Sequence, residues 1–346
     1  MLLCNTFGMA IDTFAIPARS AYLKGNGEEL FELYSIRNMD STEVRGEGAI
    51  SIGNRVFRRY IVERGYLEST LPEEYLQNFR FSKIRKQKIP RIMAIVNSTP
   101  DSFYPGSRHK NASEKLDEIM KSLPDIIDIG GESTRPGSIP VAESEEIGRI
   151  TPIMDHVTSN CSIPISLDTR HPQVALHFID SISIINDIGG FTNPEMVKIC
   201  LEYGKDCIVM HMRGTPADMQ KFTQYDDVVA EVSYFLQSQV AALVNAGVSR
   251  ERIIVDPGIG FSKDFKGNLS LLKNVDSLRF GYPILVGHSR KGFIGAVTGR
   301  PVEERLAGTL SVSAYLAQHG ADIVRVHDPA QNRDAMLMMM AMEEAD

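Results

Sequence analysis

Polar side chains that could do chemistry end a series of short apolar segments between residue 90 and the C-terminus. Each segment is rich in Ile and Val, and the polar residues come at or just after its last position. In chain order they are Asn97, Glu132 with Thr134 and Arg135, Asp168, Asn186 with Asp187, His211 with Arg213, Asp256, Ser289 with Arg290 and Lys291, and Arg325 with His327. A buried charge costs several kcal/mol unless it is paired, so any one of them could belong to a structural ion pair. Their repetition at the same point of every segment favours one shared site.

Three of these residues suit the recognition of a flat heterocycle. Asp168, Asn186 and Asp256 carry carboxylate and amide groups, which can make several parallel hydrogen bonds to a ring edge. His211, in the sequence Met-His-Met, could act as a general base or could be a hydrogen-bonded histidine at a strand end. The residues alone leave both interpretations of His211 open.

The last two segments concentrate positive charge. Arg290, Lys291 and Arg325, together with His327, indicate an anionic group, most simply a phosphate or a diphosphate. The carbonyl oxygen of Asn97 could hold Mg²⁺ beside that group, because Mg²⁺ prefers oxygen ligands and usually bridges phosphates. The residue types therefore predict a site for a flat ring linked to an anion.

Eight apolar segments must position these side chains, and we interpret them as strands. They are Ile92–Ser98, Ile126–Glu132, Pro164–Thr169, Ser183–Ile188, Cys207–Met212, Ile253–Gly258, Pro283–Ser289 and Ile323–Asp328. Because the runs are continuously apolar, both faces of the sheet should be covered, which indicates parallel strands. Residues 90–346 match the roughly 250 residues of a (β/α)₈ barrel, whose active site lies at the carboxyl ends of the strands. We therefore predict an α/β fold of the (β/α)₈ TIM-barrel type, with an open doubly wound sheet as the alternative.

Helices and loops fill the spaces between these strands. Asp226–Ala246 and Glu303–His319 are helical in pattern, and a glycine follows each of them as a stop signal. The loops Thr99–Lys110 and Gly130–Ser138, after the first two strands, are rich in Gly, Pro and small polar residues. Both are candidate lids that exclude water from a reactive intermediate, or else ordinary surface loops.

Residues 1–89 read differently from the remainder and form a predicted N-terminal extension. Gly46–Glu63 predicts a hairpin with Gly53-Asn54 at its turn, and Leu71–Phe81 predicts a helix. We find no motif in this α+β extension, so its role is unknown. The predicted domains are residues 1–89 and the barrel of residues 90–346.

The composition excludes several classes of protein. Hydrophobic residues make up 43% of the chain and charged residues 23%, as in globular proteins. The formal net charge of -7 argues against nucleic-acid binding, because neutralising phosphates requires a basic face. We predict no membrane span, since no run of about 18 apolar residues occurs. Four scattered cysteines and no signal-peptide pattern indicate a cytoplasmic protein with reduced thiols.

The segments and their polar ends resemble those of dihydropteroate synthases, a family of the (β/α)₈ pterin-binding superfamily. The resemblance covers residues 91–346 and is carried by IMAIVNSTPDSF, IIDIGGESTRPGS, ISLDT, IINDIGG, IVMHMRGTPADMQ, IIVDPGIGF, PILVGHSRKGFIG and ADIVRVHD. It implies a transferase that condenses 6-hydroxymethyl-7,8-dihydropterin diphosphate with 4-aminobenzoate by a dissociative mechanism. The products are 7,8-dihydropteroate, for folate biosynthesis, and diphosphate. Sulfonamides, as mimics of aminobenzoate, are expected to compete.

The resemblance also implies roles for individual residues. The implied catalytic residues are Asp168, Asp256, Lys291 and Arg325. The implied pterin pocket comprises Asp168, Asn186, Met210, Asp256, Lys291 and Arg325. Diphosphate is implied to contact Asn97, Arg325 and His327, with Mg²⁺ held at Asn97. The implied aminobenzoate environment comprises Thr134, Arg135, Pro136, Phe261, Ser289 and Lys291. The family is commonly dimeric, so a homodimer is expected.

The chain departs from the family pattern at one position of the first loop, at one position of the barrel and in its N-terminal extension, residues 1–89, which we call the head. Pro105 stands where an Asp is usual in the first loop, and Ala94 where Gly is usual.

Two alternatives share the predicted pocket: a pterin-dependent methyltransferase domain and a non-catalytic pterin-binding protein. The segments TPDSF, SRK and RVH favour the synthase, because the methyltransferases have no diphosphate to bind.

Overall fold

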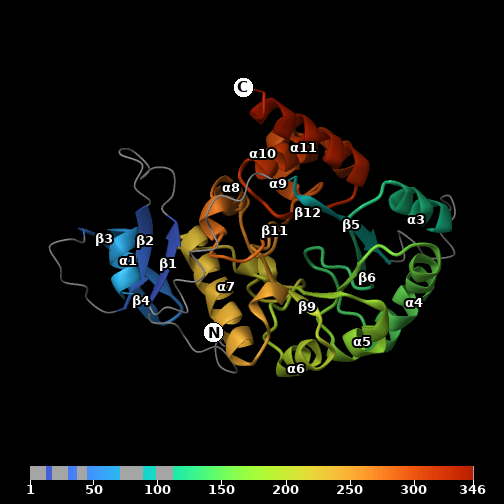
Figure 1. The fold of residues 1–346 in the computed structure, drawn as a ribbon, viewed down its shortest axis with the longest axis horizontal. Helices are drawn as coiled ribbons and strands as arrows, with labels where there is room; N and C mark the ends of the chain where they lie inside the picture. The colour runs from blue at the N-terminus through green and yellow to red at the C-terminus, as the bar shows by residue number, and fades with distance from the viewer. Residues whose placement is uncertain (1–12, 18–29, 37–44, 71–88, 99–111, 346) are drawn as a thin grey trace.

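The computed structural model describes residues 13–17, 30–36, 45–70, 89–98 and 112–345 (Figure 1). Its larger sheet has eight parallel strands: β5 (Arg91–Asn97), β6 (Ile126–Gly130), β7 (Ile165–Asp168), β8 (Ile184–Asp187), β9 (Asp206–Met210), β10 (Ile253–Asp256), β11 (Leu285–Gly287) and β12 (Ile323–Val326). Their order is β10-β9-β8-β7-β6-β5-β12-β11, and a parallel bridge between Val255 and Ile284 closes the circle. The predicted (β/α)₈ barrel and all eight predicted strands are confirmed, and each strand ends one or two residues earlier than expected.

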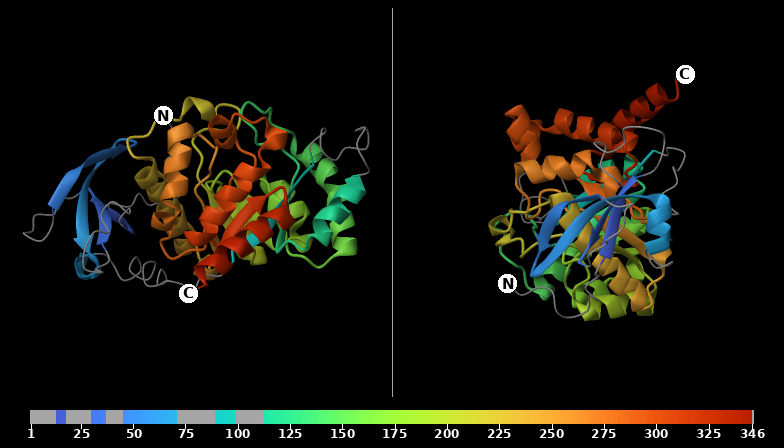
Figure 2. Two further views of the ribbon diagram at one scale, coloured as in Figure 1. Left: turned by 90° about the horizontal axis from the view of Figure 1, so that it is seen from above. Right: turned by 90° about the vertical axis from the view of Figure 1, so that its left-hand side faces the viewer.

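Helices surround the barrel sheet (Figures 1 and 2). They are α3 (Ala112–Lys121), α4 (Glu143–Asn160), α5 (Pro172–His177), α6 (Pro194–Tyr203), α7 (Val228–Asn245), α8 (Phe265–Lys273), α9 (Gly292–Thr298), α10 (Leu306–Gln318) and α11 (Pro329–Glu343). The predicted helix Asp226–Ala246 is α7, which begins after the Asp227 cap, whose carboxylate accepts from two main-chain amides. The predicted helix Glu303–His319 is α10, preceded by a short 3₁₀ turn.

Side chains that face the barrel axis form successive layers. The lower layer is a separate apolar cluster with one residue from nearly every strand: Met93, Ile126, Ile184, Ile208, Ile254, Leu285 and Ile323. Side chains alternate between the two faces of a strand, so the residue two positions further along points to the same axis. The lower layer is therefore a floor, and the next inward position of each strand lies one level nearer the carboxyl ends.

The head is a four-stranded antiparallel sheet in the order β1-β2-β4-β3. Its strands are β1 (Thr13–Pro17), β2 (Leu30–Ser35), β3 (Arg45–Ile52) and β4 (Arg55–Glu63), followed by helix α1 (Arg64–Thr70). Strands β3 and β4 confirm the predicted hairpin with its turn at Gly53-Asn54, whereas β1 and β2 were not predicted. The predicted helix Leu71–Phe81 lies outside the described residues, and the proposed domain boundary at residue 90 stays a prediction.

One face of the head sheet packs against helix α7 of the barrel (Figure 2). Tyr234 of α7 contacts the rings of Phe14 and Phe57, at centroid distances of 5.4 and 5.2 Å. The Gln237 side-chain amide, also on α7, donates to the Ala15 carbonyl at 2.9 Å. These three head residues and Gln237 are buried. The head therefore shares a core with the outer surface of the barrel and is not a detached appendage.

Two further expectations concern the membrane and the thiols. Among the described helices, none has both the length and the apolar character needed to cross a membrane. Cys161, Cys200 and Cys207 are free, and the last two are buried. Cys4 lies outside the described residues.

Candidate active site

Five predicted site residues occupy equivalent positions above the barrel floor. Asn186, Met210, Asp256 and Arg325 each come two residues after an isoleucine of the floor, and Asp168 is the cross-strand partner of Asn186. Asp256 is likewise paired with Met210. Strand alternation thus turns these side chains, which come from four neighbouring strands and β12, toward the barrel axis just above the floor. The convergence follows from the strand pattern itself.

Arg325 is the centre of this level. Its Nε donates to Oδ2 of Asp128 and its Nη2 donates to Oδ2 of Asp168, both at 2.5 Å. Asn186 Nδ2 donates to both carboxylate oxygens of Asp128 at 3.3 Å. The two aspartates are buried, with exposed fractions of 0% and 7%. One guanidinium and one amide therefore hold two carboxylates in fixed orientations inside the barrel.

The pKa values of Asp168 and Arg325 are both raised, for different reasons. Burial raises the pKa of Asp168 to about 7, against the opposing attraction of Arg325. The pKa of Arg325 is itself raised above its ordinary value, because the favourable interaction with Asp128 and Asp168 outweighs its burial. Arg325 therefore stays a cation at every accessible pH, which suits a residue that faces an anion.

Asp256 and Lys291 form the opposite side of the site. Asp256 Oδ1 accepts from the Gly258 amide at 2.7 Å, and burial raises the pKa of this carboxyl group. Gly258 needs its glycine, because its φ of +66° is left-handed and a Cβ would lie 2.1 Å from the carbonyl oxygen of His211. Lys291 Nζ donates to the Ile259 carbonyl oxygen. Burial lowers the pKa of Lys291 to about 8, although Asp256 favours the charged form.

An apolar wall adjoins these charges. Ile188, Met210, Met219 and Phe261 form a small buried cluster of their own, separate from the floor and from the outer core. Lys291 Nζ lies 4.5 Å from the centroid of the Phe261 ring. The structure thus brings the predicted residues Met210, Phe261 and Lys291 together, and an aromatic ring could lie against this wall.

The predicted anion-binding residues are only partly available. His327 Nδ1 lies 3.0 Å from the hydroxyl of Ser289, and burial together with Arg325 lowers the pKa of His327 to about 4. His327 is therefore neutral near pH 7 and offers a hydrogen bond. Arg290 forms a bidentate ion pair with Asp328, with hydrogen bonds of 2.8 and 3.0 Å. Its guanidinium therefore already has a carboxylate partner.

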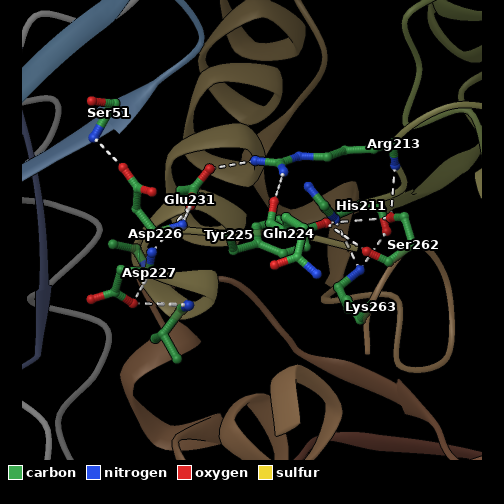
Figure 3. A network of polar contacts seen from close by, with 12 residues as sticks. Ser51, His211, Arg213, Gln224, Tyr225, Asp226, Asp227, Glu231, Ser262 and Lys263 are labelled. Carbon is green, nitrogen blue, oxygen red and sulfur yellow. Dashed lines mark hydrogen bonds and ion pairs between the residues drawn. The ribbon is translucent and has the colours of Figure 1, made fainter. Parts of the chain in front are cut away.

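Lys263 is a buried lysine that was not among the predicted site residues (Figure 3). Its Nζ donates to the carbonyl oxygens of Phe261, Gly258 and His211 at 2.8, 2.9 and 3.2 Å. His211 Nδ1 lies 3.0 Å from the same Nζ. Burial lowers the pKa of both side chains well below their usual ranges. This geometry favours the interpretation of His211 as a hydrogen-bonded histidine.

A chain of polar contacts connects the head to the loop after β10 (Figure 3). The Ser51 amide donates to Asp226 at 3.2 Å, and the Asp226 amide donates to Glu231 Oε1 at 2.8 Å. Glu231 pairs with Arg213, whose own amide donates to the Ser262 hydroxyl at 2.9 Å. Contacts therefore run from the head, across the start of α7, to the segment that carries the apolar wall.

The remaining predicted residues lie on loops or at their bases. Thr134, Arg135 and Pro136 follow β6, and the last two are exposed. Asn97 ends β5 and pairs in register with Gly130 at the start of that loop. The contacts described place none of these four side chains against the central cluster. The first loop, including Pro105, lies outside the described residues.

Asn97 is the predicted magnesium ligand at the end of β5. Within the described residues, the Asn97 side chain has no hydrogen-bond partner, and no three His, Cys, Asp or Glu side chains are grouped to hold a metal. A metal ion here would therefore take one protein oxygen and complete its shell with substrate and water oxygens. Mg²⁺ binds phosphate substrates in this way, so the residues fit it.

Asp128 is the site residue that the sequence analysis missed most plainly. It follows the floor residue Ile126 by two positions, as Asn186 follows Ile184. The signal was therefore present in the sequence, because the same spacing marks the other inward polar residues. Asp128 was not predicted as a site residue because it lies in the middle of its apolar segment, whereas the predicted residues were taken from the segment ends.

Comparisons with known proteins show which proteins this chain is similar to. Residues 93–327 match the family model described as pterin binding enzyme. The dihydropteroate synthase of Escherichia coli is 38% identical over 257 residues, covering 73% of this chain and 91% of the relative. A Xanthomonas albilineans dihydropteroate synthase solved with 4-aminobenzoic acid is 36% identical, with a TM-score of 0.70 over 75% of this chain and 95% of the other. The Yersinia pestis enzyme, solved in a sulfonamide drug complex, is 33% identical, with a TM-score of 0.69 and coverages of 76% and 97%.

The chain belongs to the pterin-binding enzyme family. Within that family, the relatives and the solved structures named above are all dihydropteroate synthases, which are transferases. The match includes the barrel strands that carry Asp168, Asn186, Asp256 and Arg325.

Proposed function

We propose that this protein is a dihydropteroate synthase that joins a dihydropterin diphosphate to 4-aminobenzoate in folate biosynthesis. The observation that carries the proposal is the buried cluster of Arg325, Asp128, Asp168 and Asn186, with Asp256 and Lys291 opposite. It offers hydrogen-bond acceptors for a ring beside a permanent cation for an anion. The relatives' printed names and the aminobenzoate complex support the same reaction.

The pterin would bind to acceptors that the protein leaves unused. Among the described residues, Asp168 Oδ1, Asp256 Oδ2 and Asn186 Oδ1 have no hydrogen-bond partner. Their neighbouring atoms are already engaged, so each acceptor is held in a fixed direction. A ring edge rich in N–H donors, such as that of a pterin, complements three fixed acceptors. Met210 would pack against the ring, and Lys291 would donate to one of its acceptors.

The diphosphate would leave toward Arg325 and His327. The bond between the pterin methylene carbon and the bridging oxygen breaks, and both electrons depart with diphosphate. Arg325 stabilises the leaving charge, and His327, which is neutral near pH 7, contributes the one ring N–H that a neutral imidazole carries. Asp168 and Asp256 supply negative charge beside the cationic pterin. The aminobenzoate nitrogen then forms a bond to the methylene carbon and releases one proton to water.

Magnesium would be held by Asn97 at the diphosphate. When bound, Mg²⁺ supplies positive charge to phosphate oxygens. Asn97 would fix the position of the ion, because this residue lies at the end of a strand in register with Gly130. Removing the amide by Asn97→Ala should therefore raise the Mg²⁺ concentration needed for half-maximal rate.

The aminobenzoate would lie above the pterin, between the barrel mouth and the second loop. Phe261 and Ser289 line the barrel side, while Thr134, Arg135 and Pro136 come from the loop. Lys291 lies near both substrates, because it touches the Phe261 ring and faces Asp256. A homodimer and a cytoplasmic location complete the proposal; the first rests on the resemblance to the family and the second on the sequence pattern.

Diphosphate release measured with and without 4-aminobenzoate tests the function. We expect release that requires the arylamine, increases with Mg²⁺ and is inhibited competitively by a sulfonamide. Pterin binding without turnover would instead indicate a non-catalytic binding protein. Methyl transfer to a corrinoid would indicate the methyltransferase alternative.

A further inference from the structure

The second loop, predicted as Gly130–Ser138, extends in the structure from the end of β6 at Gly130 to the start of α4 at Glu143, and one side chain closes its base. Glu132, just after β6, accepts two parallel hydrogen bonds from the guanidinium of Arg170, Nε to Oε2 and Nη2 to Oε1, both at 2.9 Å. Glu132 Oε1 also accepts from the amide of Val141 at 3.3 Å, at the far end of the loop. A single carboxylate therefore joins both ends of the loop to the segment after β7.

The Arg170 pair is well suited to fix a position. The Glu132 side chain is 7% exposed and that of Arg170 is 24% exposed, so water competes weakly for the carboxylate. Two parallel hydrogen bonds also fix the relative orientation of the two groups, which one point contact cannot do. Arg170 comes two residues after Asp168, whose strand is the neighbour of β6. The Glu132–Arg170 pair, which we call the clamp, therefore fixes the position of the loop relative to the strand that carries Asp168.

The loop tip is fixed by weaker contacts. The Gly137 amide donates to the Pro216 carbonyl oxygen, in the segment after β9, at 2.9 Å. The Ser138 amide donates to the Arg135 carbonyl oxygen at 3.0 Å within the loop itself. Gly137 has a φ of +79°, which a glycine adopts without strain. These main-chain contacts hold the tip only while the base keeps its place.

We propose that Arg170 is a positioning residue for the arylamine substrate. By clamping Glu132, it holds the loop so that Thr134, Arg135 and Pro136 border the aminobenzoate position. This inference rests on the proposed function for the identity of the substrate. It assigns a role to a residue outside the site residues named above, and it predicts an effect on one substrate only. Arg170 touches neither substrate.

Replacing Arg170 separates this role from a general loss of structure. We expect Arg170→Met to raise KM for 4-aminobenzoate about tenfold, because two charge-assisted hydrogen bonds are lost. KM for the pterin diphosphate should stay within about twofold of the wild-type value, since the substitution does not alter the contacts of Arg325 and Asp256. Arg170→Lys should recover only part of the loss, because an ammonium cannot pair in parallel with both oxygens.

Hydrogen exchange supplies a readout independent of turnover. In Arg170→Met, the Gly137 and Ser138 amides should exchange faster than in the wild type, while amides of β6 and β7 keep their protection. The matched control is Arg300→Met, which removes another Arg–Glu pair at 2.9 Å on the surface, with Glu304. Arg300→Met should change neither KM nor the exchange of the loop.

The outcomes separate the clamp from the proposed function. Unchanged aminobenzoate KM and unchanged loop exchange in Arg170→Met would overturn the clamp. Equal increases in both KM values would also overturn it and indicate a general structural role. If the wild type releases no diphosphate with aminobenzoate, the proposed function fails, and exchange at Gly137 still decides whether the clamp exists.

Discussion

The two halves that we propose for the candidate site, one for the pterin and one for the arylamine, are built in different ways. The pterin half consists of side chains on strands, such as Asp168, Asn186 and Asp256, which are 7%, 4% and 5% exposed. The arylamine half consists partly of the second loop, where Arg135 and Pro136 are exposed. Strand residues are held by the register of the sheet, whereas loop residues depend on a few clamping contacts. The first half is therefore preorganised by the fold, and the second by individual hydrogen bonds.

This difference has a consequence for the order of events. A heterocycle can bind to acceptors that are already oriented, so the pterin half needs little rearrangement. The proposed arylamine half borders the second loop, and its ordering can follow the binding of the first substrate. Substitutions in the strands should therefore harm both chemistry and folding. Substitutions in the loop should change mainly the affinity for the arylamine.

The largest effect is expected from Arg325→Met. It leaves Asp128 and Asp168 buried without their cation and removes the charge that faces the diphosphate. We expect a loss of kcat of about a hundredfold to a thousandfold and a destabilisation of about 3–5 kcal/mol. Steady-state kinetics and denaturant unfolding measure the two effects.

A second variant distinguishes lost chemistry from lost folding. In Arg325→Met combined with Asp128→Asn, the unpaired charge of Asp128 is absent, so part of the stability should return. Activity should not return, because the cation is still missing. Near-normal activity in Arg325→Met would contradict the central position given to this residue.

The next effect in size is expected from Asp256→Asn. The amide places a donor where the pterin needs an acceptor, which should raise KM for the pterin diphosphate about tenfold to a hundredfold. KM for 4-aminobenzoate, measured at saturating pterin, should stay near the wild-type value. Equal effects on both substrates would erase the distinction between the two halves at this residue.

Lys291 lies where the halves meet, and its charge can be titrated. Burial lowers the pKa of its ammonium to about 8. The cation is therefore present below pH 8 and is lost as the pH rises through that value, so kcat/KM should fall on the alkaline side. Lys291→Arg should flatten this limb, because a guanidinium stays protonated to above about pH 12. A limb that is unchanged in Lys291→Arg would assign it to another group.

The barrel could be predicted from the sequence because each of its strands has a clear local sequence pattern. Each is a continuous apolar run with a polar end, and the isoleucines two residues before Asn186, Asp256 and Arg325 already fix a common level. Alternation along the strand then gives the direction of each side chain. The same rule locates Asp128, which shows that the periodicity carried more information than the ends of the segments.

Long-range pairings could not be predicted in the same way. Lys263 looks like an ordinary surface lysine in the sequence, yet it is buried against three carbonyl oxygens. Arg290 resembled an anion ligand but is paired with Asp328. The polar contact of Ser51 with Asp226 joins residues 175 positions apart. Such contacts depend on how loops and domains meet in space, and local patterns do not encode that.

The smallest effect is expected from Gly137→Ala in the second loop. An added Cβ meets nothing within 4 Å, so the cost arises only from the left-handed φ of +79°, about 1 kcal/mol for a non-glycine residue. That strain should weaken the docking of the loop tip on Pro216 and raise KM for 4-aminobenzoate about threefold to fivefold. The pterin KM and thermal stability should hardly change, because the strands are untouched. Gly148→Ala, in helix α4 with open space around it, is the matched control and should leave both KM values unaltered. A change in the pterin KM of Gly137→Ala would show that the loop reaches into the half that we assign to the strands alone.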